Sequence, residues 1–451
     1  MLRRLVPAVL VCLLLPVGGL SHAGNQHSYA LGNDAALTGG AVGATTSDGA
    51  ALWYNPAGLG ANMRDSVDLS GSAFVLRFLD IPDVVQTTLP SGVITRGLSG
   101  SDLLAVPSAI AYVRHLAPGL SLAFGLFVPE LDKLDLSSSL AQKEATFDYR
   151  QRIRIVGDLT RYKGGLGIGW AVTPTLRLGA TLFTSVGIES AVTSFWFDVE
   201  STEPDNPGRA LSLFQEDATA FRVGLQVVTG VQWEPVKNWS LGFTMRTPSF
   251  DVHESHNIAE LSVAGAVTPD GQGDIALGFA ESGTTGFTFL QTEPFTFNVA
   301  VAWAFAEEAH IAAEVELQPG FGAGTGEDDR ASLWNARVGV RFPIADRLYG
   351  GLGIFTDKSP SPDPRQVGGL QTDFLGFSAG IQIRTPLTVG KGQGPGSLVF
   401  TTTVAARYLY GTGHAGSLAI DLFGDVATPS RDPIAVTVHE IGLHLGSGLL
   451  F

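Results

Sequence analysis

The C-terminal segment contains a histidine–glutamate pattern that could hold a zinc ion. His439, Glu440 and His444 stand in the order of a zinc protease signature, in which two histidines four residues apart share one helix face and bind the metal. Here the histidines are five residues apart, in a segment of period two. In such a strand the two side chains point to opposite sides. The sequence therefore argues against a zinc site, and we expect no metal and no cofactor.

Other patterns that carry chemistry are also missing. The chain has no GxSxG nucleophile elbow and no phosphate loop ending in Lys-Ser or Lys-Thr. An acidic cluster, GEDDR at residues 326–330, has oxygen ligands for a divalent cation but is more typical of a solvated loop. We therefore expect that the protein is not an enzyme.

The first residues predict a secretory signal peptide, residues 1–23. Arg3 and Arg4 precede an apolar run from Leu5 to Leu20, and Ser21-His22-Ala23 forms a cleavage signal. Two prolines within the run disfavour a retained membrane anchor. The chain's single cysteine, Cys12, lies inside this segment, so the exported protein would have no disulfide. A large exported protein without disulfides is typical of a bacterial envelope.

The composition indicates a membrane protein without membrane helices. Hydrophobic residues make up 45% of the 451 residues and charged residues only 16%, with 56 glycines. No apolar run after Ala23 reaches the roughly 18 residues that a transmembrane helix needs. The apolar residues must therefore be placed by alternation, as in a transmembrane β-barrel. The net charge of -15 excludes a nucleic-acid-binding protein on electrostatic grounds.

The alternation predicts an all-β fold: a transmembrane antiparallel β-barrel of about fourteen strands. Every second connection is short, as in VTPT and EPVKN, whereas the intervening connections at 80–104, 129–160, 189–217 and 251–293 are predicted to be long loops. Short turns on one rim and long loops on the other are typical of outer-membrane barrels. The expected strands begin near residues 66, 105, 119, 161, 175, 218, 239, 294, 309, 332, 347, 370, 396 and 434.

The two faces of these strands differ in character. Four tryptophans beside the short turns, Trp170, Trp233, Trp239 and Trp303, share the parity of the apolar face and predict a lipid-facing girdle at the periplasmic rim. A soluble sandwich would not ring one end with tryptophan. The opposite faces carry the residues expected to line the lumen: Arg177, Arg222, Gln226, Arg246, Glu314, Glu316, Arg337, Arg341, Arg384, Arg407 and Glu440.

A compact, turn-rich segment precedes the first strand. ALWYNPAGLG, residues 51–60, combines breaker residues with large apolar ones, and residues 24–63 as a whole are too apolar for a free tail. We predict that residues 24–63 form a plug, or hatch, inside the lumen of a barrel spanning 64–451. The residues expected to hold this hatch or to act in transport are Trp53, Tyr54, Asn55, Pro56, Ala57 and Gly58. A turn that merely caps the barrel is an equally good interpretation.

The front end also resembles a known family. A Gly-rich opening, a short Ala/Asp segment and then Asn55-Pro56-Ala57 are similar to the N-terminal hatch of the FadL-type outer-membrane transporters (OMPP1/FadL/TodX). The resemblance covers about 30 residues. It implies a fourteen-stranded barrel closed by the hatch, passive uptake of hydrophobic small molecules, most typically long-chain fatty acids, and a sideways exit through the barrel wall. It also implies a monomer in the outer membrane of a Gram-negative bacterium, surrounded by outer-membrane lipid and lipopolysaccharide.

Several alternatives stay open on the sequence alone. Related barrels with a similar front end transport aromatic hydrocarbons or serve protein secretion and surface attachment. A general porin is disfavoured by the apolar hatch, and a barrel enzyme would need catalytic residues spread over separate strands. Apolar residues of the long segments, such as Leu79, Ile81, Leu134 and Leu136, either meet the substrate or pack among themselves.

Overall fold

A computed structural model describes residues 30–205, 207–267, 273–287, 290–322, 330–361, 364, 369–387, 398–421 and 433–451. The predicted signal peptide and most of the GEDDR cluster lie outside these residues. Strands dominate the described part of the chain. They are β1 (Ser66–Leu89), β2 (Gly92–Ala117), β3 (Leu120–Lys143), β4 (Phe147–Ala171), β5 (Leu176–Ser201), β6 (Arg209–Val236), β7 (Trp239–Arg246), β8 (Ser249–Val267), β9 (Gly273–Gly286), β10 (Leu290–Glu293), β11 (Thr296–Ala306), β12 (Ala309–Gln318), β13 (Leu333–Ala345), β14 (Leu348–Asp357), β15 (Leu370–Leu387), β16 (Leu398–Ala415), β17 (Leu418–Asp421) and β18 (Ile434–Leu450).

Fourteen of these strands form a closed antiparallel barrel: β1 to β7, β11 to β16, and β18. The barrel closes where β1 pairs with β18, from Ser66 opposite Leu450 onward. Closure leaves no free edge within the membrane, where an unpaired backbone would be costly. The predicted fold class and strand number are confirmed.

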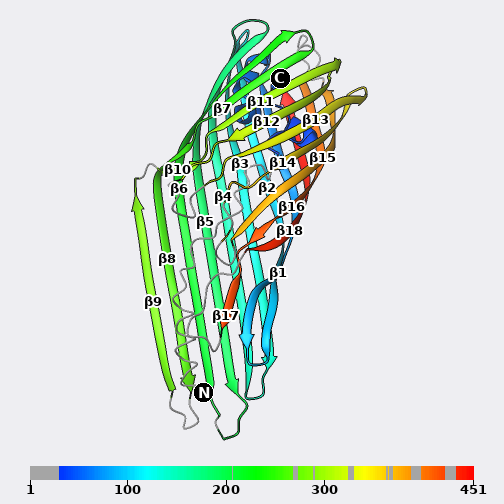
Figure 1. The fold of residues 1–451 in the computed structure, drawn as a ribbon. Coiled ribbons are helices and arrows are strands. Elements are labelled where there is room, and N and C mark those ends of the chain that lie inside the picture. Colours follow the sequence, from blue (N-terminus) through cyan, green and yellow to red (C-terminus); the bar gives the residue numbers. More distant parts are fainter. Residues whose placement is uncertain are drawn as a thin grey trace.

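The tight turns lie at the end of the barrel where the chain terminates (Figure 1). Asn238, Glu308 and Arg347 adopt positive φ angles at the second position of these turns, and each adjoins a register shift in the flanking pair of strands. This combination is typical of hairpins with a bulge beside the turn. The short connections are therefore as the sequence predicts.

The prediction of long loops at the other end is wrong. Strands β1 to β6 continue through those segments, so that β2 begins at Gly92, β4 at Phe147 and β6 at Arg209, well before the expected starts. β8 and β9 extend the same sheet, and β17 pairs in parallel with β1. The result is a one-sided wall of long strands that extends beyond β11 to β15, toward the bottom of the view in Figure 1. We call this wall the outer extension.

The polarity of the wall reverses between the barrel and the outer extension. In the barrel part of β4, Leu166, Ile168 and Trp170 point outward and glycines point inward. In the extension, Ile153 and Ile155 are buried inside while Arg152 and Arg154 are exposed outside. Such a charged exterior is unsuited to lipid, so the hydrophobic band must end below it. The extension is held by a buried apolar cluster on its inner face that includes Leu79, Ile81, Leu134 and Leu136.

The four tryptophans of the predicted girdle all lie on the outer face. Between 44% and 52% of each side chain is exposed, and Trp239 and Trp303 stack on neighbouring strands with 6.3 Å between ring centroids. The predicted lumen residues all have the opposite orientation and are buried or half-buried. The assignment of faces is therefore confirmed.

From residue 30 onward, where the described chain begins, three short helical elements precede β1: α2 (Asn33–Thr38), α3 (Ala51–Tyr54) and the 3₁₀ helix η2 (Pro56–Ala61). They pack against the inner wall, η2 mainly against β4 and β5, and α2 against β13 to β16. Among the described residues, no helix is long and apolar enough to span a membrane.

Candidate functional site

Asn55 fastens the N-terminal segment, residues 30–63, to the barrel wall. Its side chain is fully buried. The amide nitrogen Nδ2 donates to the carbonyl oxygens of Gly43, at 2.8 Å, and of Val231 on β6, at 3.0 Å. The amide oxygen accepts from the backbone N–H of Ala57 at 3.2 Å and so caps the first turn of η2. One side chain thus ties two parts of the segment to each other and to the wall.

Pro56 starts η2 and needs glycines in the facing strands. Pro is favoured at the first helical position because its missing N–H has no partner there in any case. A Cβ on Gly179 would lie 2.2 Å from the carbonyl carbon of Pro56, and one on Gly230 would lie 2.0 Å from Asn55 Oδ1. The two wall glycines therefore form the seat of the Asn-Pro turn. Ala57 and Gly58 are buried in the same contact.

Trp53 belongs to an aromatic cluster between the N-terminal segment and the wall. Its ring lies 5.9 Å from that of Phe127 on β3 and 5.7 Å from that of Phe183 on β5, and the two phenylalanines meet edge to face. Tyr54 is half-buried, and its backbone carbonyl accepts a 3.0 Å hydrogen bond from Thr244 Oγ1. Both aromatic residues line the recess described next.

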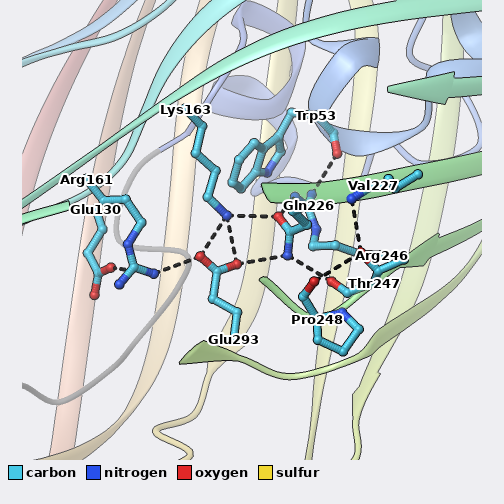
Figure 2. A network of polar contacts seen from close by, with 10 residues as sticks. All are labelled: Trp53, Glu130, Arg161, Lys163, Gln226, Val227, Arg246, Thr247, Pro248 and Glu293. Carbon is cyan, nitrogen blue, oxygen red and sulfur yellow. Dashed lines mark hydrogen bonds and ion pairs between the residues drawn. The ribbon is translucent and has the colours of Figure 1, made fainter. Parts of the chain in front are cut away.

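A network of charged residues meets this cluster from the other side (Figure 2). Glu293 on β10 is its centre: it accepts from Lys163 Nζ and from Arg161 Nη1, each at 2.7 Å. Gln226 on β6 donates to Glu293 at 3.0 Å and accepts from Lys163 at 2.9 Å. Arg161 also pairs with Glu130 at 3.4 Å. Lys163 is almost wholly buried, with 1% exposed.

Arg246 on β7 links the charged network to Trp53. Its guanidinium lies over the indole at 4.2 Å and donates to the backbone carbonyl of Trp53 at 2.9 Å. It also donates to Gln226 at 3.3 Å. The network holds three cations, Arg161, Lys163 and Arg246, and the carboxylates of Glu130 and Glu293. Buried Asp251 lines a neighbouring recess together with Arg161, so positive and negative charges are close to balance.

The network and the aromatic residues enclose a recess of about 630 Å³, part of which is open to solvent. Besides them, Pro129, Asn298, Glu316 and Arg337 line it. Arg337 donates to Glu314 at 2.7 Å and to Glu316 at 3.0 Å, so two carboxylates face one cation on this side of the recess. Arg161, Lys163 and Arg246 lie on the other side of the recess, where they could pair with an anionic group.

The barrel wall is interrupted next to the recess. β2 and β3 pair at Ser99 and Ser137 and again from Ala109 and Phe127 onward, but residues 100–108 and 128–136, all within the described chain, form no pairs across this interval. Pro129, which lines the recess, lies in the interval, and β3 shifts register against β4 between Phe127 and Glu130. Leu104 and Val128 pack with Val75 there in a small cluster of their own.

The N-terminal segment also carries a half-buried residue, Asp48, whose carboxyl is held by a backbone hydrogen bond. Asp48 accepts from the backbone N–H of Ala50 at 3.0 Å, and nearby Asp68 accepts from that of Gly49 at 2.9 Å. Burial and the negative charge of Asp68 raise the pKa of Asp48 to about 8. At neutral pH the Asp48 carboxyl is therefore mostly protonated.

The sequence did not single out the centre of the charged network. Arg246 and Gln226 were expected to line the lumen. Glu130 and Glu293 lie in segments predicted to be long loops, whereas Arg161 and Lys163 lie at the expected start of a strand. Arg161 and Lys163 have the inward parity of β4, which was an available signal. No local sequence signal marks Glu293, because its partner Lys163 lies 130 residues away in the chain. Within the described residues, no cluster of His, Cys, Asp and Glu has the arrangement of a metal site.

Comparison with solved structures places this architecture. A FadL homologue from Pseudomonas aeruginosa is similar over 94% of this chain and 99% of its own, with a TM-score of 0.57 and 11% sequence identity. The chain has the FadL-type fold. The toluene transporter TodX of P. putida matches over 95% of this chain and 99% of its own, with a TM-score of 0.55 and 13% identity. A TodX variant described as a monoaromatic hydrocarbon channel reaches a TM-score of 0.56 at 14% identity, over 93% and 98% of the two chains.

Sequence comparison adds nothing to this likeness. No protein-family model matches the chain, and no curated protein matches it. At these identities the FadL-type fold is a statement about architecture, and the function must be argued from the residues of the recess.

Proposed function

We propose that this protein takes up hydrophobic small molecules passively across the outer membrane of a Gram-negative bacterium. The observation that carries the proposal is the recess, where Trp53 and Tyr54 lie beside the cations of the charged network. A hydrophobic molecule with a polar end fits both sides. The proposal needs no resident metal or energy source, and it makes the protein a monomeric barrel surrounded by lipid and lipopolysaccharide.

In this proposal the N-terminal segment is the hatch. Asn55 and Pro56 hold it in its seat, and Trp53 connects it to Arg246. An anionic group that draws Arg246 away from the Trp53 carbonyl would loosen this connection. Binding of cargo and movement of the hatch would thereby be coupled through one guanidinium.

The cargo would leave sideways through the interruption between β2 and β3. This location is supported by Pro129, which borders both the recess and the interval without strand pairing. The side chains of Val75, Leu104, Val128 and Leu131 pack there, and Arg77 of β1 pairs with Asp132 of β3. A lateral exit delivers an apolar molecule into the bilayer and avoids periplasmic water.

Long-chain fatty acids are the first candidate cargo, because a carboxylate could pair with Arg161, Lys163 or Arg246 in the recess. Aromatic hydrocarbons are the second candidate. Trp53 and Tyr54, which line the recess, favour them, since flat rings pack well against aromatic side chains.

Blocking the exit tests the route. Leu104→Cys with Val128→Cys would link β2 to β3 across the interruption, and the exported chain has no other cysteine if the signal peptide is removed. Oxidation should abolish uptake and reduction should restore it. Val113→Cys with Ala123→Cys joins the same strands where they already pair and is the matched control. Equal uptake by oxidised and reduced Leu104/Val128 protein would reject this exit.

A further inference from the structure

A second recess lies on the opposite side of the N-terminal segment, between α2 and strands β1, β16 and β18. It has a volume of about 380 Å³, part of it open to solvent, and is mostly apolar. Its wall includes Ala36 of α2, Val75, Leu409 and Leu443. The polar residues that line it are Arg407, Glu440 and His444. Glu440 and His444 belong to the motif that resembled a zinc site.

His444 is an orphan in this recess. Only 5% of the residue is exposed, and neither ring nitrogen has a hydrogen-bond partner among the described residues. His439, by contrast, lies on the outer face, where Nδ1 is 2.9 Å from the hydroxyl of Tyr408. The two histidines therefore do point to opposite sides of β18. A buried polar group without a partner is unfavourable, and a native structure retains one only for a reason.

The other polar groups do not relieve His444. Glu440 accepts from Arg77 Nε at 2.6 Å, and the Arg407 guanidinium lies over the ring of Phe355 at 4.2 Å. Asn33 of α2 is buried nearby, and its Oδ1 also lacks a partner among the described residues. A Cβ built on Gly446 would lie 1.7 Å from that oxygen and 3.2 Å from His444 Nε2, so the orphan atoms share one corner.

We propose that this recess binds the hydroxyl end of a small hydrophobic molecule such as a phenol. A neutral imidazole offers one donor and one acceptor, and a hydroxyl group is likewise both a donor and an acceptor. The apolar wall accommodates the ring or the alkyl part. A hydrocarbon of the same shape fills the recess but leaves His444 without a partner.

The second recess and the first both border a third one. An intermediate recess shares Ala36 and Arg407 with the second and Tyr54 and Arg337 with the first. Only the route by which the molecule arrives rests on the proposed transport function. Binding at His444 is a property of the purified barrel.

The test compares phenol with toluene, which differ by a hydroxyl in place of a methyl group. The purified protein is labelled with ¹⁵N-histidine, and the His444 imidazole signals are assigned as those lost in His444→Gln. Phenol should shift these signals and toluene should not. His444→Leu should weaken phenol binding about tenfold, the equivalent of one hydrogen bond, without weakening toluene binding. His444→Gln, which keeps a donor and an acceptor, should stay within a few-fold of the wild type.

Unchanged His444 signals at saturating phenol, or equal phenol affinity in His444→Leu, would overturn the proposal. If the leucine variant does not fold, the wild-type spectra and the glutamine variant still decide. A barrel that binds phenol in this way but takes up neither oleate nor toluene in cells would refute the transport function and leave this inference intact.

Discussion

Replacing Asn55 with alanine should unseat the N-terminal segment while leaving the barrel intact. The change removes three hydrogen bonds, two from Nδ2 and one to Oδ1. At about 1 kcal/mol each, they amount to about 3 kcal/mol. The N–H of Ala57, buried and without its cap, raises the cost toward about 5 kcal/mol. The wall carbonyl that Asn55 contacts, that of Val231, lies in a hydrogen-bonded sheet, so the strands themselves lose little stability.

The assay is limited proteolysis of the folded protein in detergent, with heat-modifiable gel migration as the readout for the barrel. We expect Asn55→Ala to be cut within residues 30–63 at least a hundredfold faster than the wild type, with unchanged barrel migration. Planar-bilayer conductance should rise as the lumen opens. Asn62→Ala is the matched control, because Asn62 Nδ2 has no hydrogen-bond partner in the described chain. Equal protection of the Asn55 and Asn62 variants would refute the role of Asn55 as the fastener.

Three further predictions concern charge and packing. The pKa of Asp48 is raised to about 8, from about 3.9 in an unfolded chain. The folded state therefore binds a proton that the unfolded state has lost. The stability of the N-terminal segment should fall as pH rises from about 4 to about 8. Asp48→Asn should remove this slope in proteolysis rates measured at pH 5, 7 and 9; an unchanged slope would assign it to another group. Glu293→Gln removes the carboxylate that pairs with Lys163 and Arg161. It should tighten oleate binding about tenfold without changing toluene binding, as measured by calorimetry. Equal effects on both ligands would show that the network does not recognise the charge of the ligand. Gly230→Ala places a Cβ 2.0 Å from Asn55 Oδ1 and should reproduce the proteolysis of Asn55→Ala, whereas Gly164→Ala, with nothing within 4 Å, should not; similar protection of both would contradict the seat.

The barrel was predictable because the membrane imposes one rule on every strand. Apolar residues must face lipid and every second residue must face inward, so the alternation around Trp170 or Ile381 reveals both the strand and its orientation. Short turns then fix the strand order. The starts expected near 239, 309 and 370 agree with β7, β12 and β15 for this reason.

The outer extension was missed because the rule is inverted there. Residues 147–155 alternate as clearly as any membrane strand, but with Tyr149, Ile153 and Ile155 inside and arginines outside. This pattern carries too many charges for a lipid-facing strand, so the sequence favours a loop here. A search for any alternation of charged and apolar residues, whichever face is apolar, would predict these strands.

The candidate site was only half predictable. The Asn-Pro turn and its aromatic neighbours can be recognised from their local sequence. The structure places all six predicted residues, Trp53 to Gly58, against the wall or the recess. The charged network depends on register between strands far apart in the chain, and so does the orphan state of His444. No local pattern encodes these contacts.

The central claim is that hydrophobic molecules pass through this barrel by way of the hatch. The most direct measurement is the uptake of labelled oleate and toluene by cells that lack their own transporter, with equal amounts of wild-type protein, Asn62→Ala or the disulfide-locked Leu104/Val128 variant in the outer membrane. Cells with wild-type protein or Asn62→Ala should take up at least one of the two compounds, and this uptake should be lost when the exit is locked. No uptake of either compound by a correctly assembled barrel would contradict the account.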